Sequence, residues 1–178
     1  MISRKRSAEM VRRYLACLLG LGGMLMAFPS LSANLPPPAG KTILIVSGKI
    51  TNSNTQQSVV FDRAMLEQLG TDTVRTKTPW HDGEITFSGV RLDKLMAYVG
   101  AEGQSVTAVA LNDYVTTIPI DDFSRFQVIL ALKRNGEYMS VRDKGPLFII
   151  YPFDSDSTLQ SQVYFGRSAW QVAKLLVE

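Results

Sequence analysis

The chain has 178 residues, of which 19 are Lys or Arg, 16 are Asp or Glu and one is His, so its formal net charge is +3 at pH 7. Its single cysteine is Cys17, which leaves the rest of the chain without a thiolate for a disulfide, a metal site or a nucleophile. No Lys/Arg cluster follows Arg13, which argues against a nucleic-acid-binding protein.

The first 33 residues have the composition of a secretory signal peptide. A basic segment ending at Arg13 precedes the apolar run 15–28 and then small residues up to Ala33. The apolar run has 14 residues, fewer than the ~20 that a membrane-spanning helix needs, and an uncleaved anchor is the alternative. Cleavage after Ser32 or Ala33 would leave 14 basic and 15 acidic residues, a net charge of −1. We therefore expect an exported, periplasmic protein.

The exported part alternates β-favouring runs with short apolar segments of helical period, which predicts one α+β domain over 41–178. A proline-rich lead-in at 34–40, expected to be extended and loose, precedes this domain. In chain order, the predicted elements are a strand at 41–47, a helix at 61–69, strands at 71–78 and 84–88, a helix at 92–99, and strands at 105–111, 114–120, 127–133, 138–141, 147–151 and 163–177.

Turn and capping residues mark several connections. The pairs at 112–113 and 135–136 predict hairpins, and Gly89 is expected to close the strand at 84–88. The acidic pair at 121–122 is interpreted as the cap of a short helical turn. Residues 154–160 are expected to form a polar loop or a short helix.

The residues available for catalysis are few. His81, in a Trp-His-Asp-Gly segment, is interpreted as a loop residue, because a zinc site needs three or four converging ligands. A hydrolase would need a nucleophile elbow, and no Gly-x-Ser-x-Gly sequence is present. Paired acids can perform glycoside chemistry, but helix capping is the favoured interpretation of Asp121 and Asp122. The sequence therefore predicts no catalytic residue and no metal ligand.

Flat and hydrogen-bonding side chains gather at predicted loop boundaries, namely Trp80, Asn112, Asp113, Tyr114, Tyr151, Arg167 and Trp170. A planar heteroaromatic ligand suits this combination, because aromatic faces stack and a carboxylate accepts two hydrogen bonds from an amino-pyrimidinone edge. The alternative is that these residues are core aromatics and turn formers.

The order of several short motifs resembles the molybdopterin-binding domain of the sulfite oxidase family. The motifs are Gly48-x-Ile50, Val74-x-Thr76-x-Thr78-Pro79-Trp80, Phe87-x-Gly89-Val90-x-Leu92-x-x-Leu95, Asn112-Asp113-Tyr114, Ile129-Leu-Ala131, Asn135-Gly136, Gly145-Pro146-Leu147, Tyr151-Pro152 and Arg167-x-x-Trp170. The resemblance spans roughly 41–177 and implies a single α+β domain of mixed sheets and short helices that cradles a pyranopterin.

The resemblance also implies a departure from the family's chemistry. Family enzymes carry a molybdenum-binding cysteine in the segment that corresponds to 76–80, where this chain has Thr76 and Thr78. A hydroxyl is a poor substitute for a thiolate toward a soft metal, so pterin binding is expected and oxidoreductase activity is not.

The expected ligand is accordingly a free pterin, with molybdopterin as a less favoured alternative. We expect Thr78 beside the pterin, Trp80 against its ring, and hydrogen bonds from Asn112, Asp113 and Tyr114. Arg167 is expected to wall the ligand or, equally, to pair with a surface acid.

Size, export and the missing cysteine resemble a group of periplasmic pterin-binding relatives that relay ligand state to a membrane-bound enzyme of cyclic di-GMP turnover. Two alternatives stay open: an oxidoreductase holding the molybdenum cofactor without the cysteine, and an interaction module without a ligand. The export route is also open, because the pair Arg12-Arg13 fits either a twin-arginine signal or an ordinary basic segment.

Overall fold

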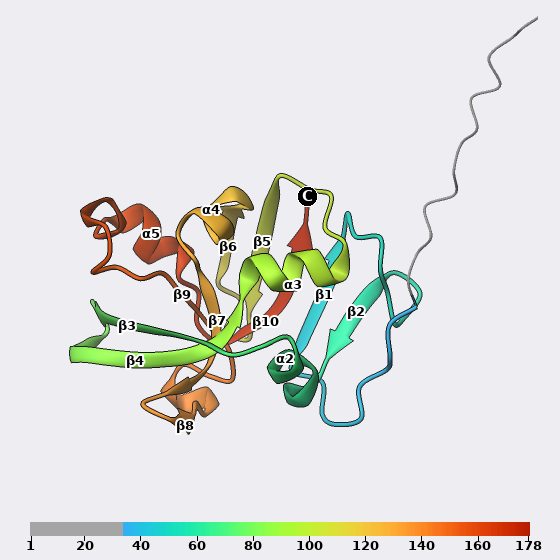
Figure 1. Cartoon of the computed structure of the whole chain (residues 1–178), viewed down its shortest axis with the longest axis horizontal. Coiled ribbons are helices and arrows are strands. Elements are labelled where there is room, and N and C mark those ends of the chain that lie inside the picture. The colour runs from blue at the N-terminus through green and yellow to red at the C-terminus, as the bar shows by residue number, and fades with distance from the viewer. Residues whose placement is uncertain (1–33) are drawn as a thin grey trace, which may run out of the picture. The chain divides into compact units, whose positions relative to one another are not determined.

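The computed structural model describes residues 34–178, which form two β-sheets with short helices (Figure 1). The strands are β1 (Leu44–Gly48), β2 (Ser58–Phe61), β3 (Asp72–Thr78), β4 (His81–Arg91), β5 (Ser105–Ala110), β6 (Val115–Pro119), β7 (Ile129–Arg134), β8 (Glu137–Tyr138), β9 (Phe148–Ile150) and β10 (Val172–Val177). The helices are α2 (Arg63–Gln68), α3 (Leu92–Val99), α4 (Asp121–Arg125) and α5 (Gln162–Arg167), with 3₁₀ turns η1 (Val141–Asp143) and η2 (Ser157–Leu159). The predicted α+β class with mixed sheets is confirmed.

The first sheet has the strand order β2-β1-β10-β5-β6. Its C-terminal strand β10 runs parallel to β1 and antiparallel to β5, so the two ends of the domain meet in the middle of the sheet. Gly48 ends β1 with a φ of +94°, and a Cβ there would lie 2.1 Å from the carbonyl oxygen of Val177. Only glycine permits this approach, which explains the Gly48-x-Ile50 motif.

The second sheet has the order β3-β4-β7-β8, and β9 pairs with β7. The predicted closure of a short strand by Gly89 is wrong, because β4 continues through this residue to Arg91. Gly89 is needed for another reason: a Cβ at this position would lie 2.1 Å from the carbonyl oxygen of Leu130 on β7. His81, expected in a loop, begins β4 as the pairing partner of Thr78.

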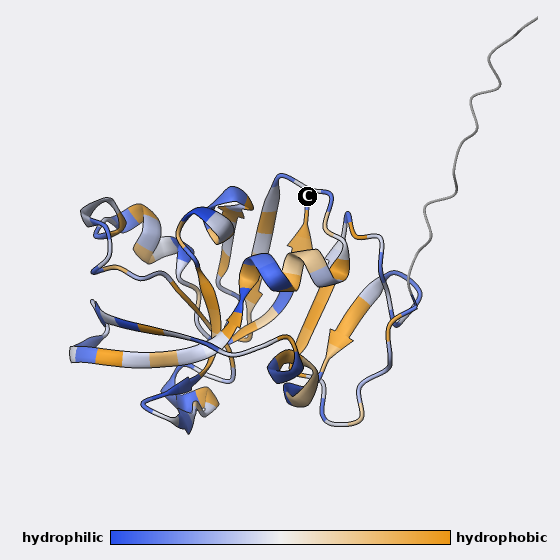
Figure 2. Ribbon diagram, in the orientation of Figure 1, coloured by the Kyte–Doolittle hydropathy of each residue, from blue (hydrophilic) through white to orange (hydrophobic). Residues whose placement is uncertain are grey.

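The main core lies between the first sheet, α3 and one face of β7, and a smaller apolar cluster lies on the other face of β7. Side chains of a strand alternate between its two faces, so Leu130 and Leu132 enter the main core while Ile129 and Ala131 enter the small one. Figure 2 accordingly shows β1, β7 and β10 as largely hydrophobic strands. Apolar clusters therefore pack on both faces of β7. This packing fixes the position of the second sheet and of its β3–β4 hairpin.

Of the two predicted helices, one has the predicted bounds and the other is shorter than predicted. α3 has the predicted bounds and ends at Gly100, which adopts the left-handed conformation. The helix expected at 61–69 is shorter, because 58–61 pairs with β1 as a strand that the sequence did not reveal. Asp62 is its N-cap and accepts a hydrogen bond from the backbone N–H of Met65 at 2.9 Å.

The acidic pair at 121–122 does not cap α4, since Ile120 occupies the N-cap position and both acids lie in the first turn. The tail predicted as one strand from 163 to 177 is two elements, α5 and β10. The lead-in at 34–40 is tied to the domain: Asp62 Oδ2 accepts hydrogen bonds from the N–H groups of Ala39 and Gly40 at 2.9 and 2.7 Å. These hydrogen bonds and the N-cap bond lower the pKa of Asp62, the cap bond most.

Candidate functional site

The end of β3 carries the two threonines of the segment that the resemblance aligns with the metal-binding cysteine. Residues alternate along β3, so Thr76 and Thr78 face inward and are buried. Thr76 Oγ1 donates to the carbonyl oxygen of Lys77 at 3.2 Å and accepts from the backbone N–H of Asp154 at 3.1 Å. The Asp154 carboxylate in turn accepts from the N–H of Lys77 at 2.7 Å. The loop after β9 therefore covers Thr76.

Thr78 belongs to a chain of three polar side chains. Arg134 Nη1 lies 3.1 Å from Nε2 of His81, and Thr78 Oγ1 lies 2.8 Å from Nδ1 of the same ring. Because a guanidinium can only donate, Nε2 accepts and Nδ1 carries the proton that is donated to Thr78. His81 is therefore neutral and cannot deprotonate Thr78, so this pair is not an activated nucleophile. Burial, and then the charges of Arg134 and Lys144, lower the pKa of His81, in agreement with a neutral ring.

Trp80 is the centre of an aromatic cluster. Its ring centroid lies 5.5 Å from Phe148, 6.1 Å from Phe153 and Phe165, and 5.6 Å from Trp170. Such edge-on and tilted contacts stabilise a core as well as a binding wall. The ring joins both apolar clusters of the domain, which gives Trp80 a structural role whatever it binds.

The predicted hairpin at 112–113 connects β5 and β6, and Asp113 there has a φ of +62°. Asp113 is exposed, and Asn112 Oδ1 accepts from the N–H of Tyr114 at 3.3 Å. The Tyr114 hydroxyl reaches across to α5 and donates to the carbonyl oxygen of Gly166 at 2.7 Å. The hairpin is thus attached to α5.

Arg167, at the end of α5, forms an ion pair with Asp122 at 2.8 Å. The hydroxyl of Tyr151 donates to the same carboxylate oxygen at 2.7 Å, and Asp122 is buried. Burial, followed by the hydrogen bond to Asp122, raises the pKa of Tyr151 above its ordinary value of 10.0, so the hydroxyl stays protonated. Arg167 thus forms an ion pair, as the alternative expectation had it, but its partner Asp122 is buried and not a surface acid.

Helix α5 therefore brings most of the predicted site residues into one neighbourhood. Its residue Phe165 contacts Trp80, Gly166 binds Tyr114, and Arg167 follows directly. The backbone N–H of Trp80 donates a hydrogen bond to the hydroxyl of Thr78 at 3.4 Å. Asn112 and Asp113 lie at the exposed end of the hairpin. The binding role of all six residues remains a prediction.

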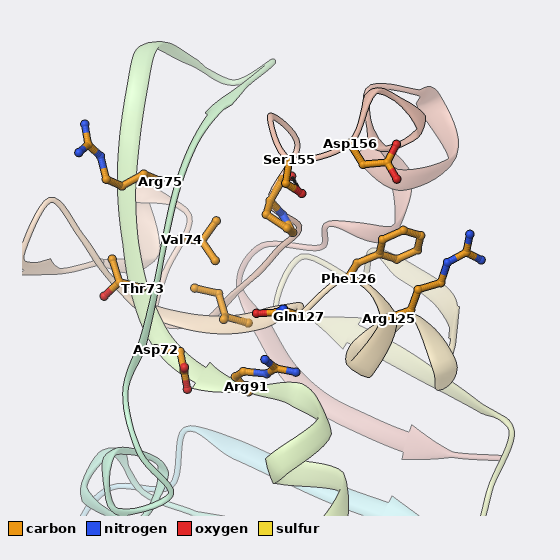
Figure 3. A pocket seen from close by; sticks show the side chains of 12 residues that line it. Asp72, Thr73, Val74, Arg75, Arg91, Arg125, Phe126, Gln127, Ser155 and Asp156 are labelled. Carbon is orange, nitrogen blue, oxygen red and sulfur yellow. Dashed lines mark hydrogen bonds between the residues drawn. The ribbon is translucent and has the colours of Figure 1, made fainter.

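A groove of about 510 Å³ lies beside this neighbourhood, and none of the six residues lines it. Its walls come from β3, the end of β4, the α4–β7 connection and the loop after β9. Figure 3 shows Val74 on one side of the groove and Phe126 on the other, with Asp156 above and Gln127 and Arg91 below. Because four separate segments build the groove, no local sequence pattern indicates these residues.

Among residues 34–178 there is no group of three or more His, Cys, Asp or Glu side chains that could hold a metal ion. No helix in this range is long and apolar enough to cross a bilayer. The groove is lined mainly by polar and charged side chains, and its apolar members are Val74, Phe126, Ile129 and Pro152.

One mixed sheet, one antiparallel sheet and short helices define an α+β domain with a polar groove. The family model of the oxidoreductase molybdopterin-binding domain matches residues 49–153, more than half of the chain, and the protein belongs to this family, whose domain binds molybdopterin. No curated protein matches the chain.

The solved structure of the sulfane dehydrogenase SoxCD from Paracoccus pantotrophus is similar, with a TM-score of 0.54 at 19% sequence identity. The similarity covers 75% of this chain and 37% of that chain, so the protein spans little more than a third of that relative. At this identity, the similarity establishes the fold.

Proposed function

We propose that the protein is a periplasmic, non-enzymatic pterin-binding protein of the molybdopterin-binding domain family. The observation that carries the proposal is the segment at 76–80, where the resemblance expects a metal-binding cysteine. This chain has Thr76 and Thr78 there and no cysteine after Cys17. The fold that receives a pterin is retained, while the thiolate that would bind molybdenum is replaced.

The residues present do not fit a molybdenum centre. High-valent molybdenum in this family prefers a thiolate, and a neutral hydroxyl is a weaker donor. Both hydroxyls are already engaged, Thr76 with Lys77 and Asp154, and Thr78 with His81. A metal ligand at either position would have to break these hydrogen bonds.

Titration calorimetry with an oxidised pterin and a tetrahydropterin tests the proposal on the purified protein. We expect saturable binding of at least one of them. An absence of binding to both contradicts the proposal and favours an interaction module that keeps the fold without the ligand.

Export is the part of the proposal that rests on the sequence of residues 1–33. The intact mass of the protein recovered from the periplasm should correspond to a chain beginning at or near Asn34. A mass that still includes Arg12 and Arg13 would instead support an uncleaved anchor.

A binding protein without catalysis needs a partner that distinguishes its bound and free forms. We propose that this partner is the periplasmic domain of a membrane signalling protein, such as an enzyme of cyclic di-GMP turnover. Recovery of partners from membranes, with and without added pterin, should give a membrane sensor whose yield changes with pterin. If no membrane sensor is recovered under either condition, the protein is a carrier rather than a relay.

A further inference from the structure

The first sheet packs one face on the main core, and α3 lies across that face (Figure 1). All four helices contribute side chains to this core. Side chains alternate between the two faces of a strand, and in all five strands those that point away from the core are exposed or only partly buried. We call this side of the sheet the outer face. Its aliphatic side chains belong to neither apolar cluster, and they are Ile45, Val60, Val109, Val115 and Leu176.

The strand pairing places these side chains in two adjacent rows. One row crosses all five strands and consists of Val60, Ile45, Lys174, Val109 and Val115. The next row has Leu176 at its centre, between Ser47 and Thr107. Val115 is 55% exposed and Leu176 is 39% exposed. A contiguous apolar patch of this kind is typical of a surface that binds another macromolecule.

A cation and an anion flank the apolar centre of the outer face at equal spacing. Lys174, Leu176 and Glu178 point to the same side of the chain, so each charged residue lies about 6–7 Å from the leucine along β10. Glu178 Oε2 accepts a hydrogen bond from Thr107 Oγ1 at 2.7 Å, which holds the carboxylate on the outer face. A carboxylate has about four acceptor positions, so others remain for a second partner. Lys174 forms no ion pair with any residue of the range 34–178.

We propose that the outer face binds a second copy of this chain in a two-fold symmetric dimer, packed sheet against sheet. In a two-fold interface, residue i of one copy meets residue j of the other, and j meets i. A two-fold axis that lies between the sheets and crosses β10 at Leu176 places this leucine against its own copy. The same axis places Lys174 of each copy against Glu178 of the other. Sheets packed face to face lie about 10 Å apart, a gap that a lysine and a glutamate side chain bridge together.

The apolar and the charged residues have different roles in this dimer. Burial of the aliphatic side chains drives association. The two ion pairs add little affinity, but they select the antiparallel arrangement of the two β10 strands, because the parallel arrangement would bring like charges together. The dimer is expected to be weak and reversible, since a face of five short strands is smaller than a standard protein interface. Trp80 and α5 lie on the core side, so the dimer does not depend on pterin binding.

Sedimentation equilibrium of the purified protein at about 10–500 µM tests the proposal, and the wild type should show a monomer–dimer equilibrium. Lys174→Glu and Glu178→Lys should each raise the dimer dissociation constant at least about tenfold, because each reversal opposes like charges. The double variant Lys174→Glu/Glu178→Lys exchanges the two charges and should return to within about threefold of wild type. Arg142→Glu reverses an exposed charge on η1, outside the first sheet, and is the matched control. Urea unfolding of each variant checks that these exposed substitutions leave the fold intact.

Loss of the dimer in both single variants and its recovery in the double variant would support the two-fold arrangement. A wild-type protein that stays monomeric over this concentration range contradicts the proposal. A dimer that neither single reversal weakens uses another surface and contradicts it as well. If the single reversals weaken the dimer and the double variant does not recover it, Lys174 and Glu178 do not face each other and the arrangement is wrong.

Discussion

The backbone N–H of Asp154 donates a hydrogen bond to Thr76 Oγ1 at 3.1 Å, and the Asp154 carboxylate accepts from the N–H of Lys77 at 2.7 Å. Residues 78 positions apart are thereby joined at the place where the family's cysteine is expected. The same loop continues into Ser155 and Asp156 at the mouth of the groove. Thr76 thus helps to position the loop that carries Ser155 and Asp156.

Asp154→Ala should loosen this loop and lower the free energy of unfolding by about 1 kcal/mol, the usual contribution of one hydrogen bond. Asp154→Asn is the control, because its amide oxygen can still accept from Lys77. Urea denaturation measures both. Equal stability of the two variants would show that the carboxylate contact contributes nothing.

Arg167→Met should lower the free energy of unfolding by about 3 kcal/mol, because it leaves the buried Asp122 carboxylate without its cation. The double variant Asp122→Asn/Arg167→Met removes the charge as well and should recover a large part of the loss. Thermal or urea unfolding provides the comparison.

A change of less than about 0.5 kcal/mol in Arg167→Met would mean that the ion pair is only a surface contact. Pterin titration of the same variants reports separately on the expected role of Arg167 in binding. Unchanged affinity together with lowered stability would assign this residue to the fold.

His81 predicts a pH dependence of stability. Its pKa is lowered in the folded protein by burial and by Arg134 and Lys144, so the unfolded chain binds more protons below the ordinary value of 6.5. The stabilisation is complete above that value and is lost as pH falls toward the lowered pKa.

His81→Gln keeps an acceptor and a donor but does not titrate, so the stability difference between wild type and variant should shrink or reverse as pH falls from 7 to 5. The aspartates whose pKa values are lowered, Asp62 and Asp156, titrate below their ordinary value of 3.8 and do not disturb this comparison. Parallel stability curves over this range would contradict a neutral, Arg134-bound ring.

The sequence predicted those elements whose pattern is local. α3 places buried side chains at helical spacing and ends at a glycine, and β3 alternates buried and exposed residues. β2 has only four residues, and it becomes a strand through pairing with β1. α5 buries no residue fully, so it lacks the apolar stripe that would have distinguished it from a strand.

The site was less predictable because its contacts join residues that are far apart in the chain. Asp122 looked like a helix cap, because its partners Tyr151 and Arg167 lie 29 and 45 residues away. Phe126 and Asp156 meet Val74 only after four segments have packed together. Composition points to tryptophan and tyrosine as binding residues, so the sequence indicates Trp80 and Tyr114 rather than the residues that line the groove.

Protein purified from its native compartment shows whether the chain binds a pterin without molybdenum. Elemental analysis for molybdenum and fluorescence of the pterin released on denaturation are measured on the same sample. We expect a fluorescent pterin and no molybdenum above background. Stoichiometric molybdenum together with released molybdopterin would contradict it and identify the protein as a cofactor-loaded oxidoreductase domain.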